Sequence, residues 1–290
     1  MALKVLLNLW KNNMKYLVSF ADNRYTKALE RFSQQAADMN VYDHIITCTE
    51  NDLDQDFKDR IGPWLRNKGT RGFGYWSWKP QIILQTLSKM NDGDLLQYTD
   101  AGCHLNPQGR GRLLEYFQQV ENSDKGMLVF ENIAPTEPLI HDGRPLPEYT
   151  ESMWCKGDLI DHLQIRDRPD ILNSPIRVAG IIFLRKSQLV ENFIRRWLDV
   201  IYHDFNLIND EPSTTPNEPG FVSHKHDQPI FSILSKLENV DSVLSAYEFY
   251  YPLNYEIGKR KWQTDWDSLK DFPIHARREI KKKFLKGENK

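Results

Sequence analysis

The chain has 290 residues, 40% of them hydrophobic and 27% charged, which suits a globular protein with one large core. Its formal net charge of −2 gives no overall attraction to nucleic acid, and no apolar run approaches the ~20 residues that span a bilayer. Three cysteines without metal-binding spacing fit a reducing compartment, and the start of the chain lacks the pattern of a signal peptide. We therefore expect a cytoplasmic protein that does not bind nucleic acid.

The first hundred residues alternate between strand and helix patterns. Short runs of strand-forming residues that end in polar loops occupy 15–20, 43–50 and 95–102. Apolar side chains at helical spacing occupy 26–40 and 79–90. This order of strands and helices predicts an α/β unit with a parallel sheet.

The second half continues the pattern in a mixed order. Helices are expected at 112–121, 154–165, 188–205 and 227–237. Strands are expected at 126–132, 176–187 and 240–246. We therefore predict one α/β domain over residues 1–255, with a mixed, mostly parallel central sheet flanked by helices.

Two segments fit neither pattern. Residues 207–225 are rich in Pro and Ser and too long for a plain connector, so they form either a mobile lid or a disordered surface loop. Residues 256–290 are predicted to form a basic C-terminal helical tail. That tail is either a solvent-exposed helix or one that leans on anionic lipid, which would place the protein peripherally at the inner face of a membrane.

The stretch "GDLLQYTDAGCHLN" (93–106) carries the clearest chemical signal. Its buried strand ends at Thr99 and Asp100, and Ala101 opens a tight turn. Ligands of open α/β sheets bind outside the carboxyl ends of strands, and a carboxylate there suits a divalent cation that bridges phosphates. Asp100 could equally cap the turn, since Asp is a common turn residue.

The stretch "RGFGYWSWKP" (71–80) concentrates aromatic and basic residues. Arg71 and Lys79 flank three rings, and an extended chain would turn Trp76 and Trp78 to one side and Tyr75 to the other. Sugars stack on indole rings, and diphosphates attract Arg, Lys and the start of a helix. The alternative is that these rings pack in the core, as tryptophans often do.

The "GYWSWKP" and "YTDAG" motifs, followed by a later "VAGIIFLRKS" strand, resemble GT-A glycosyltransferases, particularly bacterial enzymes of polysaccharide and lipopolysaccharide synthesis. The resemblance covers the order of elements over residues 15–250. It implies a GT-A-like domain and a hexosyltransferase that moves a sugar from a nucleotide-diphosphate donor, expected to be a UDP-sugar. The acceptor would be a hydroxyl of a glycan or of a lipid-linked molecule.

In that family an Asp-any-Asp motif at the strand end holds Mn²⁺ or Mg²⁺ on the donor diphosphate. This chain has only Asp100 there, so either one carboxylate suffices with help from elsewhere or basic side chains replace the cation. The resemblance assigns His226 as the second metal ligand. It also assigns Asp227 as the base that deprotonates the acceptor if the reaction inverts the sugar's configuration, or as a residue that only positions the acceptor if it retains it. Asp227 could also simply be an N-cap.

The resemblance also implies a donor site around the loop "FADNRY" (20–25), where Phe20 or Tyr25 would stack on the base. Gly180 would let a sugar approach, or would mark a structural bulge. The expected donor-binding residues are Phe20, Asp22, Arg71, Tyr75, Trp76, Lys79, Thr99, Asp100, Ala101 and Gly180. The expected acceptor or sugar pocket consists of Trp78, Glu151, Trp154 and Lys156.

Two other functions remain open from the sequence. A glycoside hydrolase needs two carboxylates at a fixed separation, and no such pair stands out. A carbohydrate-binding protein without catalytic activity would use the same aromatic residues.

Overall fold

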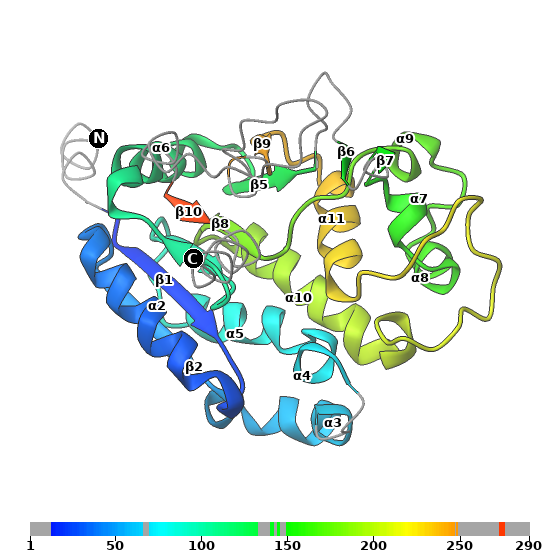
Figure 1. The fold of residues 1–290 in the computed structure, drawn as a ribbon, viewed down its shortest axis with the longest axis horizontal. Coiled ribbons are helices and arrows are strands. Elements are labelled where there is room, and N and C mark those ends of the chain that lie inside the picture. Colours follow the sequence, from blue (N-terminus) through cyan, green and yellow to red (C-terminus); the bar gives the residue numbers. More distant parts are fainter. Residues whose placement is uncertain are drawn as a thin grey trace, which may run out of the picture.

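The computed structural model describes residues 13–65, 70–132, 140–141, 144–145, 149–246, 248 and 273–275. Its centre is a six-stranded sheet (Figure 1). The strands, in their order across the sheet, are β2 (His44–Cys48), β1 (Lys15–Phe20), β3 (Leu95–Thr99), β8 (Ile181–Arg185), β5 (Met127–Glu131) and β9 (Val243–Ser245). Strand β8 is antiparallel to both neighbours and the other pairs are parallel, so the predicted mixed, mostly parallel α/β sheet is confirmed.

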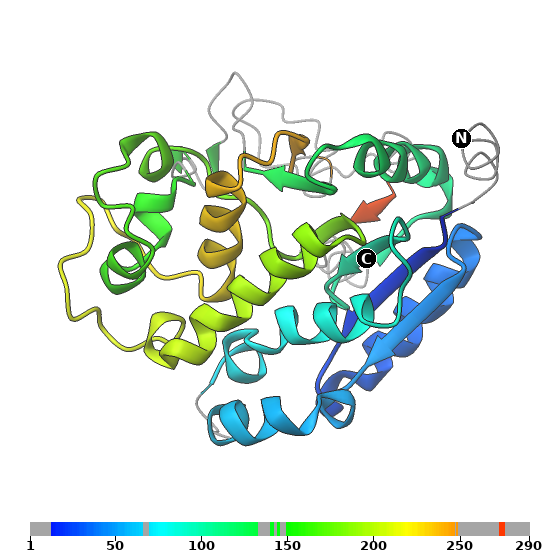
Figure 2. The ribbon, with the colours of Figure 1, turned by 180° about the vertical axis from the view of Figure 1, so that it is seen from behind.

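Alternating side chains of the strands supply a core on each face of the sheet. In β1, Tyr16, Val18 and Phe20 join one core and Leu17 joins the other. The first core is covered by α3 (Gln55–Leu65), α5 (Trp78–Leu87), α10 (Gln188–His203) and α11 (Asp227–Leu237). The second is covered by α2 (Thr26–Met39) and α6 (Arg110–Asn122). Figure 1 shows α10 running between α11 and α5, and Figure 2 shows these layers from behind.

The order of the strands places a topological switch next to β1. The chain leaves β1 toward β2 on one side and returns to β3 on the other. Loops that leave two parallel strands in opposite directions open a crevice at the carboxyl ends of those strands. The loop after β1 contains the 3₁₀ turn η2 (Asn23–Tyr25), and the loop after β3 begins at Asp100.

The expected long elements are present, with some differences at their ends. Helix α11 begins at Asp227, but the N-cap position is His226, at φ 60° and ψ −115°, so the prediction that Asp227 caps this helix is wrong. Helix α3 was not predicted, because Gly62 and Pro63 lie inside its sequence and usually interrupt helices.

Short elements complete the described chain. They are η3 (Glu50–Asp52), α4 (Gly72–Tyr75), β4 (His104–Leu105), η4 (Pro107–Gly109), β6 (Ile140–His141), β7 (Arg144–Pro145), α7 (Glu151–Trp154), α8 (Gly157–His162), α9 (Pro169–Leu172), η5 (Phe205–Leu207) and β10 (Ile274–His275).

Residues 208–226, between η5 and α11, form an ordered loop. The buried ammonium of Lys156 lies 3.4 Å from the carbonyl of Asn209 and 3.2 Å from that of Glu211. The ring of His224 accepts a hydrogen bond from the Lys156 backbone N–H through Nδ1, so Nε2 carries the proton and donates to the carbonyl of Leu207 at 2.9 Å. These contacts fasten the loop to the body of the protein, and it is not a disordered surface loop.

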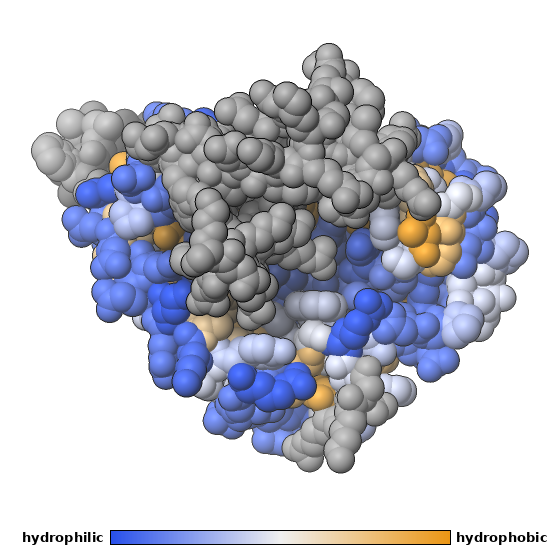
Figure 3. Space-filling view, in the orientation of Figure 1, coloured by the Kyte–Doolittle hydropathy of each residue, from blue (hydrophilic) through white to orange (hydrophobic). Residues whose placement is uncertain are grey.

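Most of the predicted basic tail lies outside the described residues, as does its expected contact with a membrane. Within it, Ile274 and His275 pair antiparallel with β4, so this segment is a strand of the main body rather than part of a separate helix. None of the helices that the structure describes has the length and hydropathy needed to cross a bilayer. On the face shown in Figure 3, the described surface is mostly hydrophilic, with small separate hydrophobic areas.

Candidate functional site

A cavity of about 520 Å³ lies at the carboxyl ends of β1 and β3, where the topology predicts a crevice. This volume falls in the range typical of small-molecule sites. We call it the switch-point cavity. Of the residues predicted from the sequence, it is lined by Phe20, Asp22, Arg71, Trp76, Trp78, Asp100 and Ala101.

Other residues lining this cavity had not been singled out as binding residues. They are Ala21, Arg24, Tyr25, Ala28, Thr70, Gly72, Phe73 and Gly102, with Tyr25 considered only as an alternative to Phe20. Arg24 follows Asp22 in the loop after β1, so its place beside the cavity could have been inferred from its neighbours. Phe73 lies in the aromatic stretch, but the backbone there adopts a conformation that simple alternation does not predict.

The aromatic stretch is tightly curled rather than extended, so the predicted strand-like approach is wrong. Phe73, Tyr75 and Trp76 all have positive φ angles, at 51°, 54° and 60°. Gly72 also has a positive φ, of 56°, and a Cβ atom there would lie 2.4 Å from the Trp76 ring. Glycine is therefore required where the indole folds back over the chain.

The rings of this stretch divide between the cavity and the core. Trp76 and Trp78 line the cavity, whereas the Tyr75 ring lies 4.9 Å from His226 and 6.0 Å from Phe205. Trp78 is 4% exposed, stacks on Phe20 with ring centroids 3.9 Å apart, and donates through Nε1 to the Gly72 carbonyl. The rings of Trp76 and Trp78 thus form a wall of the cavity, and Trp78 is held in place by its packing in the core. Tyr25, in contrast, is 49% exposed at the cavity, with the Arg24 guanidinium 5.8 Å from the centre of its ring.

Asp100 brings a carboxylate to the floor of the cavity, supported from below. The hydroxyl of Tyr98 donates to its Oδ1 at 2.6 Å, and the ammonium of Lys79 lies 3.7 Å from the same oxygen. The Lys79 ammonium is also 2.8 Å from Oδ2 of Asp227. The Asp100 side chain is 36% exposed, while those of Lys79 and Asp227 are only 4% exposed. Lys79 therefore links the starts of α5 and α11 to the end of β3.

The charges of this cluster follow from burial and proximity. Burial alone would lower the pKa of Lys79, but the negative charges of Asp100 and Asp227 outweigh it and raise that pKa, so the ammonium stays charged. Burial raises the pKa of Asp227 to about 6, against the opposing effect of Lys79. Burial and the charge of Asp100 place the pKa of Tyr98 well above its usual value, which keeps its hydroxyl a donor.

Two predicted donor-binding residues shape the site from behind rather than line it. A Cβ atom at Gly180 would lie 2.9 Å from Oδ2 of Asp100. A glycine at this position therefore makes room for the Asp100 side chain. The Gly180 carbonyl also accepts from the Asp100 backbone N–H at 2.9 Å. Thr99 is fully buried, and its carbonyl accepts from the hydroxyl of Ser19.

Arg71, which lines the cavity, and His226, the last residue of the loop 208–226, both contact the start of this loop. Arg71 forms a bidentate ion pair with Asp210, in which Nε lies 3.1 Å from Oδ2. Nδ1 of His226 lies 2.8 Å from the carbonyl of Ile208, and Nε2 lies 3.9 Å from Oδ1 of Asp210. Burial lowers the pKa of His226, so its ring is mainly neutral near pH 7.

The predicted pair of metal ligands does not form a divalent-cation site. Asp100 contacts Tyr98 and Lys79, and His226 contacts Ile208 and faces Asp210. Both oxygens of Asp210 are already engaged by Arg71. Across the described ranges, no three side chains of His, Cys, Asp or Glu are grouped to hold a metal ion. With the Lys79 ammonium beside Asp100, these residues do not fit Mn²⁺ or Mg²⁺, which prefer several oxygen ligands.

The other residues predicted for the sugar pocket have structural contacts instead. Glu151 has no exposed surface and forms an ion pair with Lys236 at 2.5 Å. Trp154 is buried, stacks on Tyr149, and carries the ammonium of Lys225 at 4.0 Å from its ring centre. Lys156 fastens the loop described above. All three are buried, and none of them lines the switch-point cavity.

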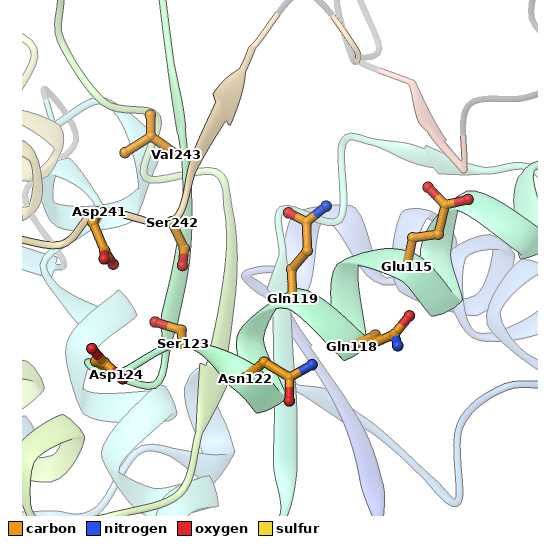
Figure 4. A pocket seen from close by; sticks show the side chains of 9 residues that line it. All are labelled: Glu115, Gln118, Gln119, Asn122, Ser123, Asp124, Asp241, Ser242 and Val243. Atoms are coloured by element: carbon orange, nitrogen blue, oxygen red, sulfur yellow. The ribbon is translucent and has the colours of Figure 1, made fainter.

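A second hollow, which we call the α6–β9 groove, lies between the end of α6 and the start of β9 (Figure 4). Its volume is about 690 Å³. It is lined by Glu115, Gln118, Gln119, Asn122, Ser123, Asp124, Asp241, Ser242 and Val243.

No protein-family profile and no curated protein sequence matches the chain. Among solved structures it is similar to a glycosyltransferase involved in the glycosylation of the major capsid of PBCV-1, with 10% identity, 94% of this chain and 99% of that chain covered, and a TM-score of 0.48. For the galactosyltransferase LgtC, in complex with donor and acceptor sugar analogues, these values are 12%, 90%, 86% and 0.41. For mouse xyloside xylosyltransferase 1 they are 9%, 91%, 97% and 0.41.

These three structures belong to the class of enzyme that the sequence motifs resemble. Each TM-score is nevertheless below 0.5 and each identity is 12% or lower. The chemistry of this chain therefore has to be argued from its own site.

Proposed function

We propose that the protein is a glycosyltransferase that binds a nucleotide-diphosphate sugar in the switch-point cavity. The expected donor is a UDP-sugar, and the acceptor is a hydroxyl of a glycan or a lipid-linked molecule. The observation that carries the proposal is the exposed carboxylate of Asp100, held by Tyr98 and Lys79 at the carboxyl end of a strand beside the topological switch. The cytoplasmic location remains a prediction from the sequence.

The walls of the cavity suit the parts of such a donor. Tyr25 offers an exposed ring on which a nucleobase can stack, and the indole of Trp76 offers a surface for a sugar. Arg71 presents a guanidinium that is 58% exposed and matches the geometry of phosphate oxygens. The three groups come from the loop after β1 and the chain before α5, the segments that frame the crevice.

The reaction requires the bond between C1 of the sugar and the diphosphate to break. Positive charge then grows on the sugar ring, and negative charge grows on the leaving diphosphate. The carboxylate of Asp100 reaches the cavity and can accept a hydrogen bond from a sugar or acceptor hydroxyl. The Lys79 ammonium beneath it attracts this carboxylate and holds it in place.

The structure changes the role that we assign to Asp227. Its side chain is 4% exposed and its carboxylate contacts Lys79, so it does not face the cavity as a base for the acceptor would. We assign it as a positioning residue that holds the Lys79 charge. The same geometry disfavours a glycoside hydrolase built on Asp100 and Asp227, because the lysine ammonium contacts both carboxylates and leaves only one of them exposed.

A thermal-shift screen with UDP, GDP, CMP and dTDP tests the proposal. We expect UDP to raise the melting temperature by about 5 °C at a hundredfold excess over its dissociation constant. UDP-sugars should then be tested for release of UDP, with and without glycan acceptors. A protein that none of these nucleotides stabilises would not be a nucleotide-sugar glycosyltransferase. Stabilisation by glycans alone would favour a carbohydrate-binding protein.

A further inference from the structure

We propose that the switch-point cavity binds the diphosphate of its donor with two arginines, Arg24 and Arg71, and without a divalent cation. This inference rests on the proposed function and concerns how the same site balances the charge of its ligand.

The oxygen and nitrogen atoms around Asp100 disfavour a divalent cation. Its Oδ1 is taken by the hydroxyl of Tyr98 and the ammonium of Lys79, which leaves Oδ2 as its open oxygen. One monodentate carboxylate is a poor site for an ion that prefers six or more oxygen ligands. A dication at Oδ2 would also lie close to a buried ammonium, and the repulsion between them is strong where water is excluded.

Lys79 lies where a divalent cation would otherwise be held. In a site with two carboxylates, a divalent cation would lie between them. Here the ammonium of Lys79 contacts both Asp100 and Asp227, so a protein cation already occupies that place. It is 4% exposed and therefore cannot neutralise a diphosphate by direct contact.

Two arginines supply positive charge at the surface of the cavity. Arg24 and Arg71 both line the cavity, from different segments of the chain. Their side chains are 68% and 58% exposed, and each is held by a carboxylate, Asp22 and Asp210 respectively. Each carboxylate takes Nε and one terminal nitrogen, so the second edge of each guanidinium, which carries both terminal nitrogens, remains for phosphate oxygens.

The pairing also fixes both guanidinium groups beside an empty space of the right size. The carboxylate of Asp22 accepts hydrogen bonds from Nε and from a terminal nitrogen of Arg24, at 2.8 Å and 3.1 Å. Asp210 binds Arg71 in the same bidentate manner. Each arginine is thus placed in advance, and a bound diphosphate would gain two bidentate partners without a metal ion.

Isothermal titration calorimetry of the wild-type protein with UDP, in excess EDTA and in Mn²⁺, tests the inference. We expect the two dissociation constants to agree within about threefold. Arg24→Met and Arg71→Met should each weaken UDP binding in EDTA by about tenfold, the effect of losing one charge-assisted interaction. Arg71→Lys should recover part of the loss, because it keeps the charge but not the bidentate geometry.

Two controls separate phosphate binding from structural effects. Uridine lacks the diphosphate, so its affinity should change by less than about threefold in the arginine variants. Arg168→Met removes an exposed arginine that pairs with Asp170 in the same way but lies outside the cavity, and it should leave UDP binding unchanged.

Each other outcome has a clear meaning. UDP binding that is lost in EDTA and restored by Mn²⁺ would overturn the inference and leave the proposed function standing. Equal losses for uridine and UDP in the arginine variants would also overturn it. Failure of the wild-type protein to bind UDP or the other nucleoside diphosphates in either buffer would instead refute the proposed function.

Discussion

Two hollows in the described part of the chain, the switch-point cavity and the α6–β9 groove, differ more in position and chemistry than in size. The α6–β9 groove has the larger volume, about 690 Å³ against about 520 Å³ for the switch-point cavity. It lies at the starts of β5 and β9 and is lined mainly by amide, hydroxyl and carboxylate side chains (Figure 4). The cavity lies at the ends of β1 and β3, where aromatic walls meet a carboxylate held by a buried lysine. Strand direction and anchored charge, rather than volume, therefore indicate the functional site.

The largest effect expected from this difference is on stability. Lys79→Met removes the cation between Asp100 and Asp227 and should lower the free energy of unfolding by about 3–5 kcal/mol, because a buried carboxylate is left without its partner. Urea denaturation measures this loss. Lys125→Met, which follows the groove residue Asp124 in the chain, should cost less than about 0.5 kcal/mol.

A double variant sharpens the same prediction. Lys79→Met combined with Asp227→Asn should be more stable than Lys79→Met alone, since the uncompensated charge is gone. If Lys79→Met alone costs less than about 1 kcal/mol, the buried cluster does not hold these elements together.

The next effect is on catalysis. Asp100→Asn should slow release of UDP from the donor by about 10²–10³-fold, because the amide cannot supply negative charge to the reacting sugar. Asn can still accept from Tyr98, so the fold should persist. The matched variant in the groove is Asp241→Asn, which should keep the wild-type rate. Equal rates for both variants and the wild type would remove Asp100 from the reaction.

The sequence predicted the sheet and the floor of the site well, because both depend on local patterns. Strands β1 and β3 are short runs rich in apolar residues, and the place of Asp100 follows directly from the end of a strand. Parallel strands align their carboxyl ends, so the meeting of the loops that follow them can be predicted without knowing the contacts between distant segments.

The remaining parts of the site depend on contacts between distant segments. The link from Lys79 to Asp227 joins residues far apart in the chain, and a helix-start Asp looks like an ordinary cap in sequence. Likewise, Glu151 lies in a polar stretch of sequence and could be expected to contact a ligand, yet it is buried and paired with Lys236. The curled backbone around Tyr75 also defeats the rule of alternating sides, which holds only for extended chains.

The pH dependence of stability should distinguish the buried cluster from the exposed groove. Burial raises the pKa of Asp227 to about 6 in the folded protein, above the value near 4 of an unfolded chain. The native state therefore holds the proton over this interval, and the contribution of Asp227 to stability falls as pH rises from 4 to 6. The total change is about 3 kcal/mol for a shift of this size.

Asp227→Asn removes this titration. The free energy of unfolding of this variant, relative to the wild type, should therefore rise between pH 4 and pH 7. Urea denaturation across this range measures the difference, in which groups common to both proteins largely cancel. A difference that does not vary with pH would show that Asp227 titrates alike in the folded and unfolded protein.

The smallest predicted effect concerns the mouth of the cavity. Tyr25 is 49% exposed there, whereas Phe20 is 3% exposed and stacked on Trp78, so of these two rings Tyr25 is the one that can meet a nucleobase. Tyr25→Ala should weaken UDP binding by about tenfold, the effect of losing one stacked ring, with little change in stability. Leu114→Ala removes a similarly exposed hydrophobic side chain on α6 and should leave binding unchanged. Calorimetry that gives Tyr25→Ala the wild-type affinity would place the base elsewhere in the cavity.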